Sequence, residues 1–239
     1  MSLDEPRGGE PPPEQLAKEF AQLARRLLSR ESVQGTLDEI VHLAVNSVPG
    51  CDAAGVMVLH GNRRVESPAV SDPRLRRSDQ AQFDLQEGPC LEAVWEGESY
   101  LVGDMTRETR WPRYVPAALD LGIRSMLGIK LFTREDTLGA LDLYSWRAHA
   151  FGPRTLEVGW SFASHAAVAL AAAQERAQLQ EAIHSRHVIG EAMGLLMGRL
   201  GLTEEEAFDL LRTTSNEANI KLRDIARRIV EAGELPGGR

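Results

Sequence analysis

The side chains in this 239-residue sequence best suited to binding chemistry are seven cations near its C-terminal end. Arginine and lysine contact phosphate groups, so a cluster of them points to a nucleic-acid partner. Between residues 179 and 230, however, eight acids accompany these seven cations, which gives a net charge of −1. Strong sequence-independent phosphate binding is therefore not expected, and each cation could equally lie on a solvated polar face. The seven candidates are Arg186, Arg199, Arg212, Lys221, Arg223, Arg227 and Arg228.

The candidates for thiol chemistry are Cys51 and Cys90, which are too few to build a disulfide framework. Cys90 follows Gly88-Pro89, where a short helix is expected to begin. A helix N-terminus lowers the pKa of a thiol, so this position favours a redox or nitrosative sensor with Cys51 as its candidate partner. The alternative is that each cysteine is a small buried hydrophobic residue.

Other catalytic and metal-binding patterns are weak. His184 and His187 stand three residues apart, one turn after Glu181, which suits a metal ion but equally suits exposed helix residues. The sequence contains no Ser/His/Asp set, no phosphate-cradling glycine loop and no CxxC pair. We therefore predict no catalytic residue, no metal site and no identifiable cofactor.

The elements that must position the seven cations are three helices between residues 186 and 230. Gly201 ends the first, and Thr203-Glu-Glu-Glu206 begins the next with a capping box. Interior glycines at 190, 194 and 198 each cost a helix about 1 kcal/mol relative to alanine, so we expect a compensating contact. Close packing by the two following helices is the favoured reading, and close approach of an RNA backbone is the alternative.

The motifs of this segment resemble those of the ANTAR domain, a helical RNA-binding module at the C-termini of bacterial antitermination regulators. The matching stretches are Ala192-Met-Gly194, Leu195-Leu-Met197, Glu204-Glu-Glu-Ala207-Phe208, Leu211-Arg212 and Lys221-Leu-Arg-Asp-Ile-Ala226. The resemblance implies binding to hairpin loops of a nascent transcript, with the cations as contacts. It marks as motif or packing positions Gly190, Ala192, Gly194, Met197, Ala207, Leu211 and Ala226. The sequence departs from the pattern at Met193, where a lysine often stands.

The longer N-terminal part alternates helices with apolar strands. Helices are expected from Glu14 and, because Thr36-Leu-Asp-Glu39 reads as a capping box, from Thr36. Strands are expected over 53–60, 63–70, 100–103, 123–132 and 138–146, with short helices between the two hairpins. This order predicts an α+β domain with a mostly antiparallel sheet and helices packed on one face.

The motifs of this part resemble the GAF domain, a small sensory fold, and most of all GAF domains that precede ANTAR domains in actinobacterial proteins. The matches are Glu87-Gly-Pro-Cys-Leu-Glu92, Arg110-Trp-Pro112, Gly122-Ile-Arg-Ser125 and Leu138-Gly-Ala-Leu-Asp-Leu-Tyr144. The resemblance implies a small-molecule ligand of unknown identity. GAF domains of another branch reduce free methionine sulfoxide with cysteines, which is the enzymatic alternative.

An alanine-rich stretch without glycine or proline joins the two parts and predicts a continuous helix. Heptad spacing within it favours a parallel coiled-coil dimer, and the alternative is a helix that packs on its own domain. The heptad positions are Leu179, Ala182, Arg186, Ile189, Met193, Leu196 and Leu200. The predicted organisation is a disordered tail over 1–13, a GAF-like domain over 14–172, a linker over 173–185 and an all-α three-helix ANTAR-like bundle over 178–235.

The composition is that of a globular protein, with 43% hydrophobic residues and a net charge of −8. That charge argues against nonspecific adhesion to nucleic acid or membranes. We expect no apolar run long enough to span a bilayer and no signal peptide, which predicts a cytoplasmic protein. The sequence thus predicts a homodimeric, signal-responsive, RNA-binding antitermination regulator that is not an enzyme and has no DNA or membrane partner. The alternatives are a regulator that docks another protein without binding RNA, and the thiol-based reductase.

Overall fold

The computed structural model describes residues 13–61, 64–97, 99–134 and 136–232, without the side chains of 13–17. The predicted tail over residues 1–13 lies outside the described residues except for Pro13, where the first helix begins. The chain forms two compact units, one up to Gln174 and one from Glu175 onward.

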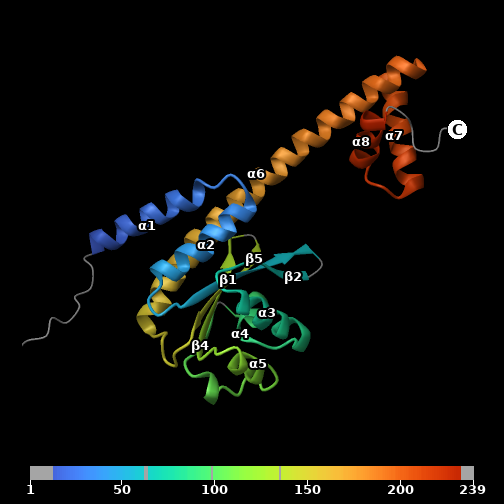
Figure 1. Cartoon of the computed structure of the whole chain (residues 1–239). Helices are drawn as coiled ribbons and strands as arrows, with labels where there is room; N and C mark the ends of the chain where they lie inside the picture. Colours follow the sequence, from blue (N-terminus) through green and yellow to red (C-terminus); the bar gives the residue numbers. More distant parts are fainter. Residues whose placement is uncertain (1–12, 62–63, 98, 135, 233–239) are drawn as a thin grey trace, which may run out of the picture. The chain divides into compact units, whose positions relative to one another are not determined.

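The N-terminal unit is built on one five-stranded antiparallel sheet in the order β2-β1-β5-β4-β3 (Figure 1). Two hairpins supply four of the strands, and the register of the central pair runs from Ala53 opposite Tyr144 to Val58 opposite Gly139. This is the predicted α+β fold with an antiparallel sheet. The strands are β1 Ala53–His60, β2 Arg64–Val70, β3 Ser99–Val102, β4 Ser125–Phe132 and β5 Thr137–Ser145.

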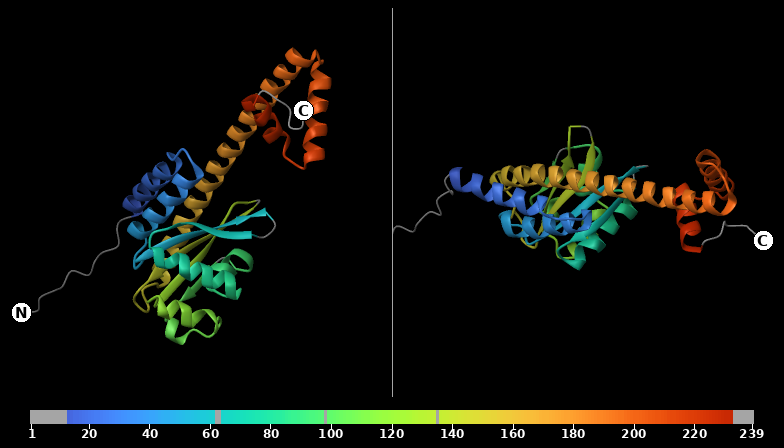
Figure 2. Two further views of the ribbon diagram at one scale, coloured as in Figure 1. Left: turned by 45° about the vertical axis from the view of Figure 1, so that its right-hand side comes forward. Right: turned by 90° about the horizontal axis from the view of Figure 1, so that it is seen from above.

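Helices cover both faces of this sheet, which corrects the expectation of a single covered face (Figure 2). The physical reason lies in the strands, since alternate residues of a strand point to opposite faces. Leu141 and Leu143 of β5 enter one apolar core, whereas Ala140 and Tyr144 enter the other. The first core contains α1 Pro13–Leu28, α2 Val33–Ser47 and the start of α6; the second contains α3 Pro73–Leu85, α4 Pro89–Trp95, the 3₁₀ turn η2 Met105–Arg107 and α5 Tyr114–Asp120.

The start of α2 differs from the sequence-based expectation. Its N-cap is Ser32, whose Oγ accepts a hydrogen bond from the Gly35 N–H over 3.0 Å, so Thr36 lies inside the helix. The side chain of Glu39 is not part of a capping box because it accepts hydrogen bonds from Arg26 of α1 and from Arg30. Glu39, which the sequence suggested as part of a cap, therefore connects α2 to α1 through its hydrogen bond from Arg26.

The C-terminal unit is a three-helix bundle formed by the end of α6, Pro153–Leu200, with α7, Glu204–Ala218, and α8, Leu222–Ala232. α6 is one helix of 48 residues, as the uninterrupted alanine-rich stretch predicted. The predicted helix boundary also occurs: Gly201 has φ +70°, and Thr203 forms the capping box with Glu206. The bundle core consists of Val188, Ala192, Leu196, Ala207, Leu211, Ile225, Ala226 and Ile229.

α6 also contains the one stretch, among the described residues, with the length and composition of a membrane span. The expectation that no apolar run reaches that length is therefore corrected. About half of the stretch, 44%, is buried inside the protein. Phe162, Ala166 and Leu170 of α6 lie fully inside the first core, so its apolar character has a structural explanation in the packing of this helix.

Candidate functional site

The motif around Cys90 lies where the start of α4 packs against α3. This buried contact, formed by Gln82 with Cys90 and Leu91, is called the joint of α3 and α4. Gln82 of α3 points its Oε1 at the start of α4, where it accepts hydrogen bonds from Cys90 N at 3.1 Å and Leu91 N at 3.4 Å. Gly88 has φ +142°, and a Cβ there would lie 2.2 Å from that same oxygen, so only glycine fits. Glu92 closes the joint by accepting a 2.6 Å hydrogen bond from Trp111 Nε1.

Both thiols are buried, and this corrects the expectation of a lowered pKa at Cys90. Cys90 is fully buried, and burial raises its thiol pKa well above the ordinary value. Burial likewise raises the pKa of Cys51 to about 12, and its Sγ donates to the Ala53 carbonyl over 3.2 Å. Cys51 belongs to the core on one face of the sheet and Cys90 to the core on the other. Because the sheet separates the two thiols, the structure does not support a thiol-based reductase or a sensor that pairs these cysteines.

A polar network surrounds Cys90 inside the second core. Its thiol lies 3.7 Å from the hydroxyl of Tyr144, which donates a 2.9 Å hydrogen bond to Asp79 Oδ1. The hydroxyls of Ser78 and Tyr114 are 2.7 Å apart in the same layer. Sequence reasoning missed this network, because its members come from α3, α4, α5 and β5 and share no local motif.

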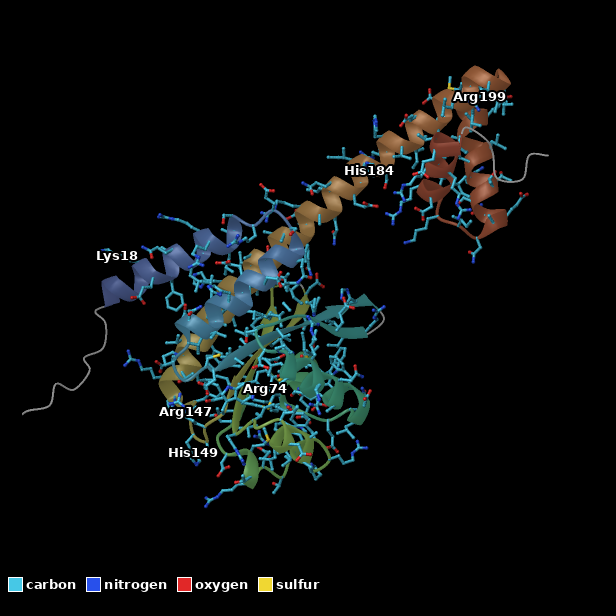
Figure 3. All side chains as sticks on the ribbon, in the orientation of Figure 1. Lys18, Arg74, Arg147, His149, His184 and Arg199 are labelled. Atoms are coloured by element: carbon cyan, nitrogen blue, oxygen red, sulfur yellow. The ribbon has the colours of Figure 1, made fainter. Side chains whose placement is uncertain are left out.

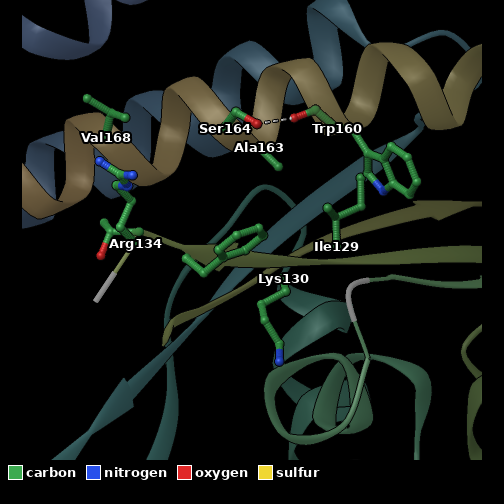
Figure 4. A pocket seen from close by; sticks show the side chains of 9 residues that line it. Ile129, Lys130, Arg134, Trp160, Ala163, Ser164 and Val168 are labelled. Carbon is green, nitrogen blue, oxygen red and sulfur yellow. Dashed lines mark hydrogen bonds between the residues drawn. The ribbon is translucent and has the colours of Figure 1, made fainter. Parts of the chain in front are cut away.

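The N-terminal unit also carries an apolar hollow of about 520 Å³ on the face of α6, beside the end of β4 (Figure 4). Its exposed apolar side chains are Phe132, Trp160 and Val168, and Arg134 lies at its edge. The residues lining it include no carboxylate, histidine or thiol. Its lining is mainly apolar, with Lys130 and Arg134 as its charged residues among those that the structure describes.

In the C-terminal unit, ion pairs occupy the candidate cations Arg212, Arg223 and Arg227. Arg212 pairs with Asp209 at 2.9 Å, and Arg227 pairs with Asp224 at 3.3 Å. Arg223 of α8 pairs with Glu181 of α6, and its Nε is buried. Arg223 therefore ties α8 to α6, and it is a poor choice for testing phosphate contacts.

The other four candidates are exposed. Arg199 lies at the end of α6, and His184 lies further back along the same helix (Figure 3). Within the part of the chain that the structure describes, Arg186, Lys221 and Arg228 have no ion-pair partner. Lys221 directly precedes α8, and Arg228 lies seven residues further on, about two helical turns, so both lie on one side of that helix. These three cations are the ones free to meet an anionic partner.

The glycines of α6 do not pack against α7 or α8, which corrects the expectation for Gly190 and Gly194. A Cβ at Gly190, Gly194 or Gly198 would meet no atom within 4 Å in the described residues. Met197 is also 38% exposed, so it does not belong to the bundle core. The other motif positions, Ala192, Ala207, Leu211 and Ala226, are fully buried.

Comparison with protein families finds a GAF domain over residues 30–171 and an ANTAR domain over residues 177–230. The chain belongs to the GAF family. It carries an ANTAR domain after the GAF domain, and the match covers the three helices of the C-terminal bundle almost completely. No curated protein matches the chain in sequence.

Solved structures agree on the fold of the GAF domain. The GAF domain of an Acinetobacter phosphoenolpyruvate-protein phosphotransferase has a TM-score of 0.53 at 14% identity, covering 69% of this chain and 98% of that one. Its counterpart from Coxiella burnetii has a TM-score of 0.54 at 17% identity, with coverages of 69% and 98%. A bacteriophytochrome of R. palustris has a TM-score of 0.58 at 10% identity, covering 87% of this chain and 48% of that one. Identities this low establish the fold alone.

The predicted heptad of the ANTAR domain divides between its core and its surface. Leu196 is buried in the bundle core, whereas Leu179 is 59% exposed. A second seam with the same alternation of four and three residues shares four positions with the predicted heptad and is exposed everywhere except at Met193, which is partly buried against the bundle core. This exposed seam consists of Leu179, Ile183, Arg186, Gly190, Met193, Met197 and Leu200. Beside it, Phe208 of α7 is 41% exposed above a shallow hollow next to Gly190.

The histidine pair of the ANTAR domain has no metal-binding geometry. His184 and His187 are exposed, and Glu181, the nearby acid, is paired with Arg223. Among the described residues there is no group of three or more His, Cys, Asp and Glu side chains that could hold a metal ion.

Proposed function

We propose that this protein is a cytoplasmic regulator of transcription, in which the GAF domain receives a signal and the ANTAR domain binds RNA hairpins to promote antitermination. The observation that carries the proposal is the ANTAR match over residues 177–230, whose motif alanines and leucine form a closed three-helix core. Arg186, Lys221 and Arg228 remain exposed and without ion pairs among the described residues, so an RNA phosphate can reach them.

The RNA-binding role is tested with the double variant Lys221→Glu/Arg228→Glu of the full chain. We expect weaker binding to a two-hairpin RNA, and a salt dependence of log K whose slope falls by about 0.7 for each lost phosphate contact. The matched control is Arg25→Glu/Arg77→Glu, which makes the same charge change at exposed positions of the N-terminal unit. If both variants weaken binding equally, the effect is one of net charge and the assignment of these two residues fails.

A second candidate function is docking of another regulatory protein without RNA binding. The observations that favour it are the ion pairs that occupy Arg212, Arg223 and Arg227, and the net charge of −1 from residue 179 to residue 230. This candidate predicts no difference between a two-hairpin RNA and a one-hairpin control, and no salt dependence beyond that of the control variant.

Pairing of two copies through α6 is the further part of the proposal. The exposed seam leaves Leu179 and Ile183 in solvent at 59% and 68% exposure, and burying them in a second copy removes that apolar surface. Light scattering on Ile183→Glu and Ala182→Glu separates the two seams, because Ala182 belongs only to the predicted heptad. We expect Ile183→Glu to give monomers and Ala182→Glu to remain dimeric; the reverse result would assign pairing to the other seam.

A further inference from the structure

Two carboxyl groups are enclosed in the second core of the GAF domain. Asp79 of α3 is 2% exposed and Asp142 of β5 is 0% exposed. Asp142 points into this core because it has the same strand parity as Ala140 and Tyr144, which belong to it. An ionised carboxylate in such a place is costly unless a cation or several hydrogen bonds compensate for the lost water.

The contacts of the two carboxyls differ. Asp79 accepts the 2.9 Å hydrogen bond from the Tyr144 hydroxyl. Neither oxygen of Asp142 has an N–H or O–H hydrogen-bond donor among the residues that the structure describes. Its interacting neighbours are the Cys90 thiol, a weak donor, and Asp79 itself. The two acids thus belong to one cluster. Asp142, which is the more deeply buried of the two, also has fewer hydrogen bonds to its carboxyl oxygens.

Among the described residues, no cation is buried within the cluster. The titratable groups that face it are Cys90 from α4, Tyr114 from α5 and Tyr144 from β5, all acids that are neutral at physiological pH. Arg76 of α3 is exposed and donates to the Ser67 carbonyl over 3.3 Å; its charge lowers the pKa of Asp79, but the effect of burial is larger and raises it. Two negative charges without a buried counterion would repel each other inside the core.

We propose that Asp79 and Asp142 form a proton-binding site in the GAF domain, which holds at least one proton between them and loosens the joint of α3 and α4 when that proton leaves. The joint is the responsive element because Asp79 and Gln82 lie one turn apart on α3, and Gln82 holds the start of α4 through Cys90 N and Leu91 N. The amide nitrogen of Gln82 is itself buried and without a partner among the described residues.

The direction of the response follows from burial. Burial raises the pKa of Asp79 from 3.8 to about 6 and raises that of Asp142 well above its ordinary value. The folded domain therefore binds more protons than the unfolded chain at pH values between about 4, the ordinary carboxyl pKa, and the folded-state pKa values, and its stability decreases as the pH rises through that interval. At low pH, where both carboxyls are protonated in either state, this loss disappears.

The test is a pH series on the full chain between pH 5 and pH 8. Carbon-13 NMR of aspartate carboxyls in the wild type should show two that titrate well above pH 4, and Asp142→Asn should remove one of them and lower the pKa of the other. The GAF-domain melting temperature of the wild type should fall relative to that of Asp142→Asn as the pH rises, with the difference smallest at pH 5. Asp84→Asn, an exposed change on the same helix, is the control and should follow the wild type.

Hydrogen exchange adds a local readout. After correction for the intrinsic rate, protection of the Cys90 and Leu91 amides should decrease with rising pH in the wild type and stay level in Asp142→Asn. Two outcomes overturn the proposal: all aspartate carboxyls titrating near pH 4, or a melting temperature and protection that depend on potassium or sodium concentration and not on pH. The second outcome would assign the acid pair to a bound cation. If Asp142→Asn fails to fold, the wild-type carboxyl titration still decides.

Discussion

Replacing the three glycines of α6 in the ANTAR domain by alanine should stabilise the bundle. The change Gly190→Ala/Gly194→Ala/Gly198→Ala adds three methyl groups, none of which would meet another atom within 4 Å among the described residues. A glycine inside a helix costs about 1 kcal/mol relative to alanine, and Gly198 is close enough to the end of α6 to cost less. The expected gain in the free energy of unfolding is therefore about 2–3 kcal/mol.

The assay must resolve the ANTAR domain, because the chain has two units and its unfolding need not be a single transition. Hydrogen exchange of the buried Leu211 amide serves this purpose. A gain of about 2–3 kcal/mol slows exchange through global opening of the bundle by roughly 30- to 150-fold. The same protein is then measured for dimerisation and for RNA binding. If the glycines serve the approach of a second helix or an RNA backbone, these activities fall while stability rises.

A destabilised bundle would refute the reasoning. It would mean that the three positions do face packed atoms, and that the expected packing of α7 and α8 on the glycines is correct after all. An increase in stability with unchanged dimerisation and RNA binding would mean that the three glycines serve neither contact. The single variant Ala192→Gly is the internal control, because Ala192 is fully buried and its loss should destabilise the same helix by about 1 kcal/mol or more.

Three further predictions concern burial. Leu211→Ala should destabilise the ANTAR domain by about 2–5 kcal/mol, whereas Phe208→Ala, at 41% exposure, should cost far less in chemical denaturation of the bundle. Glu39→Ala should destabilise the GAF domain by about 1–3 kcal/mol, since it leaves the α1–α2 ion pairs unmade, and thermal unfolding next to Asp38→Ala, an exposed neighbour, measures the difference. Cys51 and Cys90 should both resist Ellman's reagent at pH 8 and react on unfolding, because burial raises the pKa of each thiol; fast labelling of either would contradict this.

The features that could be predicted from the sequence were those that depend on residues close together in the chain. The antiparallel sheet, the capping box at Thr203 and the unbroken helix before it follow from apolar periodicity and turn residues. The second covered face of the sheet was missed although the strand over residues 53–59 is apolar at every position, which is the pattern of a strand buried on both sides. The capping box predicted at Thr36 is not formed, because its Glu39 partner pairs with Arg26 of another helix and with Arg30.

The binding and buried sites were harder to predict for the same reason. Seven cations could be counted, but which of them are occupied depends on acids brought near by folding, as Glu181 is to Arg223. The pKa of Cys90 could not be inferred from its place at a helix start, because the burial that dominates it comes from the whole second core. The acid pair, on α3 and β5, leaves no trace in local spacing.

The two seams of α6 amount to two phases of one heptad. They share Leu179, Arg186, Met193 and Leu200, and they differ only in whether the intervening position is three or four residues on. At 100° per residue, the midlines of the two stripes lie about 50° apart around the helix axis. Of the predicted heptad, Leu196 lies in the bundle core and Ile189 packs against it, whereas Ile183 and Met197, which belong only to the exposed seam, are exposed. A turn of α6 by about 50° would carry the exposed positions toward the bundle, so the rotation of this helix would decide which seam is left for a second copy.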